Sequence, residues 1–372
     1  MFFDWLTIEQ DFGYQLPLLG DVAYQRLRVD TGEVGALSQP KFKHAGSFCD
    51  VVTVSIRGSV LRIEGNPSRW GRLDNLFGLP TVDSCVSVFN GICRELGLPA
   101  FTKCTRLDFL QVTDDSERNG LVSDGALISE LHITSNVSVG QGNQLPYLSG
   151  LSTQPYRNSV PRLHSNGRSV DWLSKKGAAN LIYPTVYDKA HELSLHSADK
   201  IKRNFGEQSA QYAHILKIID YCNSVGMVRF EQKLKSRYLQ KHSLIYWGLS
   251  DYSVLNQLHD DFINLDKKLS VTAMDFESIS ERLISSGVVD TVRAANTTAM
   301  YALQWMHGQQ FDINKKSVQT HRARLRRVGI DINQPCNIAR FSPVFVRETR
   351  EVNPVVLSAP SWYAMPRHLR VA

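Results

Sequence analysis

Three strand-like runs of the chain each set an arginine two residues before a carboxylate. The pairs are Arg62 and Glu64, Arg106 and Asp108, and Arg229 and Glu231. Residues i and i+2 of a β-strand share a face, so each run predicts a charged face. Carboxylates can hold a hard divalent cation there, and arginines can hold phosphate. The spacing predicts metal-dependent chemistry on a phosphate-bearing substrate; a solvated face with cross-strand ion pairs is the simpler alternative.

A tyrosine adds a nucleophile to this set. Tyr187 lies in a predicted strand that we expect to run through Lys189, so that both side chains share one face. A protonated phenol is a weak nucleophile, and the Lys189 ammonium would favour the phenolate or neutralise charge in the transition state. Tyr183, on the same face, is the substitute nucleophile.

We expect a divalent metal, Mg²⁺ or Mn²⁺, on the scissile phosphate, where it would assist the leaving oxygen. The candidate ligands are Asp108, Glu231, Glu64 and Glu192. No G-x-x-x-x-G-K-[ST] loop is present, which agrees with cleavage and resealing of a strand by a reaction that needs no ATP.

Basic side chains predict a polyanionic partner. The formal net charge is +6 over 372 residues, and part of the excess falls in an acid-free stretch from Lys315 to Arg327. With the helix before it, this stretch resembles a helix-turn-helix; a charged helix packed on the rest of the protein is the alternative. Two further arginines flank a glycine-rich turn. The expected DNA ligands are Arg62, Arg69, Arg72, Arg106, Arg229, Lys315, Lys316, Arg322, Arg324 and Arg326.

The order of elements predicts an α+β fold with a mainly antiparallel sheet. Ranges 51–57 and 60–64 indicate a hairpin, 82–96 a helix, and 228–235 the strand with the clearest alternation. The stretch 114–167 is polar and predicts a long loop with a short helix near residues 128–132.

Helical spacing dominates after about residue 250. We predict helices at 252–265, 273–286, 289–307 and 317–328. We therefore predict three parts: a domain at 1–250 that carries the tyrosine and carboxylates and would nick and transfer a strand, a helical region at 251–335 that would bind DNA, and a strand or arm at 336–372.

The composition of the chain indicates the cellular compartment in which the protein acts. No long charge-free apolar stretch and no basic leader occur, so we expect neither a membrane span nor a signal peptide. The six cysteines form no C-x-x-C pair, so no zinc or redox motif is visible. Because we expect no export signal, we expect reduced thiols in a cytoplasm.

Several motifs together resemble the filamentous-phage replication initiators of the gene II type, including their RstA-type branch and the related Rep_trans plasmid initiators. The motifs are Tyr187-x-Lys189-x-x-Glu192, Arg106-x-Asp108, Val228-Arg229-Phe230-Glu231, the turn Gly65 to Gly78, and the ending through Ser361-Trp362-Tyr363. The chain lacks the His-hydrophobic-His motif of better-known rolling-circle relatives, which favours a carboxylate-rich metal site.

The resemblance implies a function in the host cytoplasm. Such a protein nicks one strand of a duplex origin, stays on the 5′ end through a tyrosine that corresponds to Tyr187, and later recloses the displaced strand. Its partners would be the origin duplex, the displaced single strand, and the host helicase and polymerase. Two alternatives stay open: a DNA-binding regulator without cleavage activity, and the same chemistry serving plasmid replication or mobilisation.

Overall fold

The computed structural model describes residues 1–48, 50–110, 120–174, 181–265, 276–306, 308–334 and 354–363. Packing divides the chain into two units, and the division is discontinuous in sequence. The first unit comprises Met1–Ser138, Ala179–His259 and Val355–Ala372, and the second comprises Val139–Ala178 and Asp260–Pro354. The chain passes from one unit to the other at 138/139, 178/179, 259/260 and 354/355.

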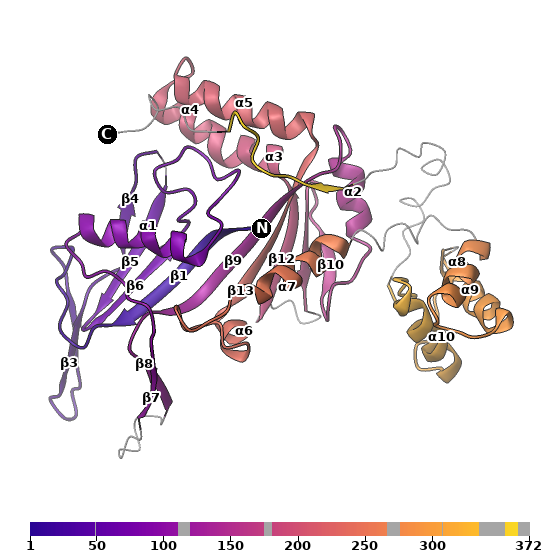
Figure 1. Ribbon diagram of the computed structural model, residues 1–372, viewed down its shortest axis with the longest axis horizontal. Helices are drawn as coiled ribbons and strands as arrows, with labels where there is room; N and C mark the ends of the chain where they lie inside the picture. The colour runs from indigo at the N-terminus through magenta and orange to yellow at the C-terminus, as the bar shows by residue number, and fades with distance from the viewer. Residues whose placement is uncertain are drawn as a thin grey trace. The chain divides into compact units, whose positions relative to one another are not determined.

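An antiparallel sheet forms the first unit, in the order β12-β13-β9-β1-β6-β5-β3-β2, with β4 beside β5 (Figure 1). Its strands are β1 (Phe2–Asp11), β2 (Tyr24–Leu27), β3 (Val34–Ser38), β4 (Phe42–Ala45), β5 (Val51–Arg57), β6 (Val60–Gly65), β9 (Leu127–Ser138), β12 (Ile182–Asp188) and β13 (Met227–Lys235). A separate two-stranded ribbon joins β7 (Leu107–Leu110) to β8 (Gly120–Ser123). Together with the helices, this sheet confirms the α+β class.

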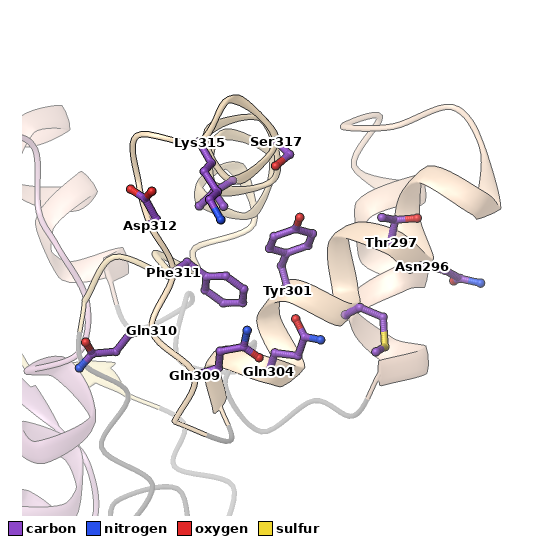
Figure 2. A pocket seen from close by; sticks show the side chains of 12 residues that line it. Asn296, Thr297, Tyr301, Gln304, Gln309, Gln310, Phe311, Asp312, Lys315 and Ser317 are labelled. Carbon is purple, nitrogen blue, oxygen red and sulfur yellow. The ribbon is translucent and has the colours of Figure 1, made fainter.

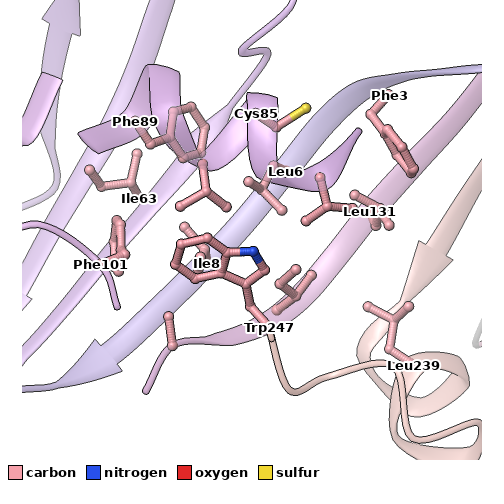
Figure 3. Packing of buried hydrophobic residues seen from close by; sticks show 14 of the residues in the cluster. Phe3, Leu6, Ile8, Ile63, Cys85, Phe89, Phe101, Leu131, Leu239 and Trp247 are labelled. Carbon is pink, nitrogen blue, oxygen red and sulfur yellow. The ribbon is translucent and has the colours of Figure 1, made fainter. Parts of the chain in front are cut away.

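Helix α1 (Val82–Glu95) covers one face of the sheet. Thr81 caps it by accepting a hydrogen bond from the Ser84 amide, and Gly97 follows its end with a positive φ of 66°. Phe89 and its apolar neighbours pack on Leu6 and Leu131 of the sheet (Figure 3). Side chains alternate along each strand, so the opposite face is left for polar residues.

A second set of helices follows β12 directly. It consists of α3 (Lys189–Leu193), a π-helical turn (Ser194–Ala198), α4 (Asp199–Phe205) and α5 (Ala210–Ser224). Their apolar side chains share a core with Leu73 and Leu76 of a loop that follows β6. This loop, residues 66–79, is held against the helices and against β1. The first unit also contains α6 (Ser236–Lys241) and most of α7 (Val254–Ile263).

The second unit holds α2 (Gln144–Leu151) and the hairpin of β10 (Val160–Leu163) and β11 (Ser169–Leu173). It also holds three helices, α8 (Phe276–Ser285), α9 (Val292–Met306) and α10 (Lys316–Arg327), around a core that includes Ala299 and Leu325. The predicted helices after residue 250 are confirmed. No helix within the described ranges is both long and apolar enough to cross a membrane.

The predicted loop over residues 114–167 is wrong, because β8, β9, α2 and β10 lie within it. Residues 127–138 form β9, the central strand, where we expected a loop with a short helix. The register with β1 slips between the pairs Thr7–Glu130 and Ile8–Ile128, which leaves one extra residue on β9. This bulge turns both Ile128 and Leu131 toward the core, three residues apart, and so mimics helical spacing.

Candidate active site

Tyr187 lies on the polar side of the sheet, near the end of β12. The register places it opposite Arg229 of β13, and Arg229 in turn opposite Asn136 of β9. Glu231 lies two residues along β13 on the same face, and the Tyr187 hydroxyl donates a hydrogen bond of 3.2 Å to its Oε2 atom. The predicted pairing of a tyrosine with a strand carboxylate is therefore present.

Glu231 is itself held by a histidine and a lysine. His132 Nδ1 lies 3.2 Å from Glu231 Oε1, and Lys233 Nζ lies 3.6 Å from the same oxygen. The other nitrogen of His132 lies 2.9 Å from Glu130. Burial opposes ionisation of Glu231, but His132, Lys233 and Arg229 outweigh it and lower its pKa to about 2.

The phenol of Tyr187 is protonated in this arrangement. Burial raises its pKa well above the ordinary value, the negative charge of Glu231 raises it further, and Arg229 offsets only part of this. The nucleophile must therefore lose its proton during the reaction. Glu231 is the carboxylate in hydrogen-bond contact with it.

The prediction that the strand runs through Lys189 is wrong. β12 ends at Asp188, which accepts a hydrogen bond from the His191 amide as the N-cap of α3. Lys189 is 1% exposed, and its Nζ atom donates to Glu192 Oε2 at 2.5 Å. Burial and the charge of Arg229 lower the pKa of Lys189, against the pull of Glu192. The motif thus becomes a buried ion pair at a helix start.

Arg229 is fully buried beneath the site. Its Nε atom donates to Asn136 Oδ1 at 2.9 Å, and Nη2 donates to the backbone oxygens of Asn75 and Leu76 at 2.9 and 2.6 Å. Its Nη1 atom lies 3.6 Å from Asp4 Oδ2. This side chain has 0% exposure, so its expected role as a DNA ligand does not fit its position.

The 66–79 loop forms hydrogen bonds with the charged side chains around the tyrosine. The Asn75 side chain accepts from Lys189 Nζ at 3.3 Å and donates to Asp4 Oδ1 at 2.7 Å. Asn66 donates to the same Asp4 oxygen at 2.6 Å. The loop passes so close to β1 that a Cβ atom on Gly78 would lie 2.4 Å from the Phe2 ring. One loop therefore contacts Asp4, Lys189 and Arg229 together.

Removing the Arg229 charge should destabilise the first unit. Arg229→Met leaves Asp4 buried without its cation and the Asn75 backbone oxygen without the Arg229 donor, while the Leu76 oxygen keeps only its hydrogen bond from Asn136. We expect a loss of about 3–5 kcal/mol in the free energy of unfolding, measured by urea denaturation. Arg62→Met is the control, because Arg62 is 37% exposed in a surface pair with Glu9, a contact worth about 1 kcal/mol or less. Equal losses in the two variants would contradict the structural role.

Two of the four expected metal ligands lie outside this cluster. Glu64 shares the sheet face with Glu231, but three strand spacings and four residues separate them, roughly 20 Å. Glu64 pairs with Lys41 at 2.7 Å. Asp108 lies on the separate β7–β8 ribbon, 57% exposed, and pairs with Arg106 at 3.1 Å. Of the four expected ligands, Glu231 of β13 and Glu192 of α3 are the two that act on the charge of the tyrosine.

Within the part of the chain that the structure describes, no group of three or more His, Cys, Asp or Glu side chains is arranged as a metal site. Mg²⁺ commonly binds through one or two carboxylates and takes its other ligands from water and substrate phosphate. Glu231 and Glu192 both raise the pKa of the Tyr187 phenol, so both lie within electrostatic reach of it. Both side chains offer carboxylate oxygens of the kind that Mg²⁺ takes, and each already faces a lysine, Lys189 for Glu192 and Lys233 for Glu231.

Four of the expected DNA arginines lie elsewhere in the first unit. Arg62 and Arg106 are surface side chains, each paired with an acid. Arg72 donates inside the 66–79 loop, to the backbone oxygens of Ser68 and Phe77.

Arg69 is the fourth of these arginines. It donates to Ser197 Oγ at 3.3 Å, and its buried Nε atom has no hydrogen-bond partner. Its charge helps to lower the pKa of Glu192. Arg69 therefore keeps an unsatisfied donor within electrostatic reach of the site.

The basic helix of the second unit is α10. Val318, Leu325 and Val328 face its core, as predicted, while Lys315 and Lys316 are exposed.

The remaining cations of α10 differ in availability. Arg322 makes a two-pronged ion pair with Asp331, at 2.6 and 2.9 Å. Arg324 is half-buried and Arg326 is exposed. A cavity of about 660 Å³ lies between α9 and α10, with Tyr301, Phe311 and several amide side chains in its wall and Lys315 beside it (Figure 2).

Several residues of the site were not predicted from the sequence. They are Asp4, Asn75, Glu130, His132 and Asn136. Each reaches the site through strand pairing or loop contacts with residues far away in the chain. The only signal was the polar loop sequence between Gly65 and Gly78, which the resemblance included.

Comparisons with known proteins agree with this picture. A family model for the C-terminal part of a replication-associated protein matches residues 283–369. The replication-associated protein of Escherichia phage If1 is 69% identical over 322 residues, which cover 87% of this chain and 100% of that protein. No solved structure matches the chain.

These matches define a phage replication-associated protein. The chain belongs to the gene II family of replication-associated proteins, and the predicted resemblance to filamentous-phage replication initiators is confirmed.

Proposed function

We propose that this phage replication initiator cuts one strand of duplex origin DNA through Tyr187 and later recloses the displaced strand. The observation that carries the proposal is the hydrogen bond from the Tyr187 hydroxyl to the buried carboxylate of Glu231. A nucleophile in contact with a base that other side chains orient is the usual arrangement for covalent catalysis. Family membership supports the replication context.

In the proposed reaction the phenol proton passes to Glu231 as the Tyr187 oxygen attacks phosphorus. The bond from phosphorus to the 3′ oxygen breaks, that oxygen takes up a proton, and a 5′-phosphotyrosine remains. One phosphodiester replaces another, so the reverse attack by a 3′ hydroxyl recloses a strand without ATP. Arg229 supplies positive charge near the tyrosine as charge develops on the phosphate, and Lys189 holds Glu192 beside it.

The resting site opposes this proton transfer. The pKa of Glu231 is about 2, while that of the Tyr187 phenol is raised above its ordinary value. An incoming phosphate brings negative charge, which draws on the same cations that now stabilise ionised Glu231. We therefore expect DNA binding itself to make Glu231 a better base, which restricts cleavage to the bound state.

We propose that Glu231 and Glu192 hold a divalent metal, Mg²⁺ or Mn²⁺, because carboxylate oxygens are the hard ligands that such cations prefer. When bound, the metal polarises the scissile phosphate and favours the phenolate. The chain's own residues orient the carboxylates: Lys189 holds Glu192, and His132 holds Glu231.

The experiment uses the whole chain with supercoiled phage DNA and Mg²⁺. Open circles that carry protein on a 5′ end support the enzyme, and mass spectrometry of the DNA-linked peptide identifies the attached residue. Shifted but uncut DNA would instead support the second candidate, a DNA-binding regulator of phage replication. The exposed cations of α10 favour that second candidate as much as the first.

We also propose that the helical part of the second unit binds DNA phosphates through Lys315 and Lys316. From the replication role, we further propose that the protein works with the host helicase and polymerase, and that it acts in the host cytoplasm.

Changing both lysines to glutamine should weaken duplex binding and lower its salt dependence. Each lost phosphate contact removes about 0.9 from the slope of log K against log salt, so the pair should reduce it by about 2. Fluorescence anisotropy over a salt series measures this slope. Lys41→Gln is the control, because Lys41 is already paired with Glu64. An unchanged slope in the double variant would remove α10 from the interface.

A further inference from the structure

The C-terminal segment of residues 354–363, here called the arm, returns to the first unit. Strand β14 (Val355–Val356) pairs antiparallel with Val137 and Ser138 at the end of β9, and the Leu357 amide donates to the Asn136 backbone oxygen at 2.8 Å. Since β13 already pairs along the other edge of β9, β14 continues the line of β1. The arm thus begins beside the strand that contributes Asn136 to the site.

Trp362 anchors the arm on α5. Its ring packs edge-on against Tyr221, with centroids 5.0 Å apart, and Lys217 Nζ lies 5.0 Å from its ring centre. The next residue then turns into the 66–79 loop. Tyr363 packs edge-on against Phe77 at 5.2 Å.

The Tyr363 hydroxyl forms three hydrogen bonds with this loop. It donates to Asp74 Oδ1 at 2.5 Å and accepts from Arg72 Nη2 at 2.5 Å and from the Phe77 amide at 3.2 Å. Asp74 is 4% exposed and also lies 3.6 Å from His214 of α5. These partners bracket residues 75 and 76, whose oxygens bind Lys189 and Arg229. A short stretch of one loop thus links the arm to both site cations.

We propose that the arm is a positioning element of the nicking site and that Tyr363 is the residue through which it acts. The inference rests on the proposed function, and it assigns the chain end a part in catalysis without contact with DNA. Tyr363 fixes Asp74 and Phe77, and the loop between them contacts Lys189 and Arg229. Arg229 acts on the charge around Tyr187 directly, and Lys189 holds Glu192, whose charge also reaches Tyr187. A loose loop would leave the tyrosine present but its cations displaced.

Tyr363→Phe tests the proposal, because it keeps the ring that packs on Phe77 and removes only the hydroxyl. The matched control is Tyr221→Phe, which makes the same chemical change at the arm's other anchor, away from the loop. With a single-stranded origin oligonucleotide at saturation, we expect the single-turnover rate of covalent attachment to fall about tenfold or more in Tyr363→Phe. We expect the control to react at the parental rate, with the dissociation constant for DNA unchanged in both.

A structural readout separates this inference from the nicking proposal itself. Hydrogen exchange at the Phe77 amide should accelerate in Tyr363→Phe and not in Tyr221→Phe, whether or not the parent protein cleaves DNA. If the parent forms no covalent complex, the nicking proposal fails, and faster exchange alone does not rescue the catalytic inference. A parental rate in Tyr363→Phe overturns the inference, as does a rate loss matched by an equal loss of DNA affinity.

Asp74→Asn provides a second route if Tyr363→Phe folds poorly. The amide can still accept the Tyr363 hydrogen bond but loses the charge that faces Arg72 and His214. We expect a slower rate with DNA affinity retained, and a double variant that is no slower than the worse single variant, because both changes act through one loop. Independent, additive effects would contradict a shared path.

Discussion

Phenylalanine in place of Tyr187 is expected to abolish covalent attachment to DNA while duplex binding stays at the parental level. The hydroxyl is the attacking atom in the proposed reaction, and Phe keeps the half-buried ring in β12. Loss of a covalent nucleophile commonly costs about 10⁴-fold or more in rate, which in this assay means no detectable product. Denaturing gels of labelled origin DNA measure the linked fraction, and a mobility shift measures binding.

Two controls decide which hydroxyl reacts. Tyr14→Phe removes a phenol from an exposed position and should leave attachment unchanged. Tyr183→Phe tests the substitute nucleophile on the same strand face, beside Lys233, whose ammonium lies 5.6 Å from the Tyr183 ring centre. Attachment that survives in Tyr187→Phe and vanishes in Tyr183→Phe would move the reaction to the other tyrosine. Attachment that survives in both would remove β12 from the mechanism.

Local patterning predicted the strands that carry the site. Alternation in 228–235 identified β13, and the two-residue spacing of Arg229 and Glu231 correctly placed both on one face. That face is buried, however, rather than open to solvent, because the 66–79 loop and α3 cover it. Spacing determines which residues share a face, whereas the layer that covers a face depends on tertiary packing.

The spacing of residues along one strand does not encode which strands become neighbours in the sheet. Glu64, Asp108 and Glu231 show the same local pattern, yet the strand order puts Asp108 on a separate ribbon and Glu64 several strands away. His132 was missed for a related reason. The bulge in β9 disguised its strand as a helix, and a contact between Glu231 and a residue of the adjacent strand leaves no mark in the sequence.

Glu231→Gln is the second change with a large expected effect, because it separates two possible roles of this carboxylate. The amide keeps the shape and can still accept the Tyr187 hydrogen bond, but it cannot take up the proton. General-base catalysis contributes about 10²–10⁴-fold, so the single-turnover rate should fall within that range at neutral pH. Lys233 and His132 also lose the charge they face, so a thermal melt must accompany the kinetics.

The pH and metal responses of Glu231→Gln then tell base from ligand. If the missing group is the base, hydroxide must remove the phenol proton, and the rate should rise about tenfold per pH unit because the Tyr187 pKa lies above the range tested. Extra Mg²⁺ would not restore that rate. Full recovery with Mg²⁺ alone, at neutral pH, would mean that the rate was lost through metal binding, and it would contradict the proposed role of Glu231 as the base.

Glu64→Gln is the matched control for both measurements. It makes the same change on the same sheet face, roughly 20 Å away by strand spacing and register, at a carboxylate paired with Lys41. A parental rate and Mg²⁺ response are expected there. The Glu64 side chain lies too far from Tyr187 to contact it. An effect as large as that of Glu231→Gln would therefore contradict a local role for Glu231 and would point to the total charge on this sheet face.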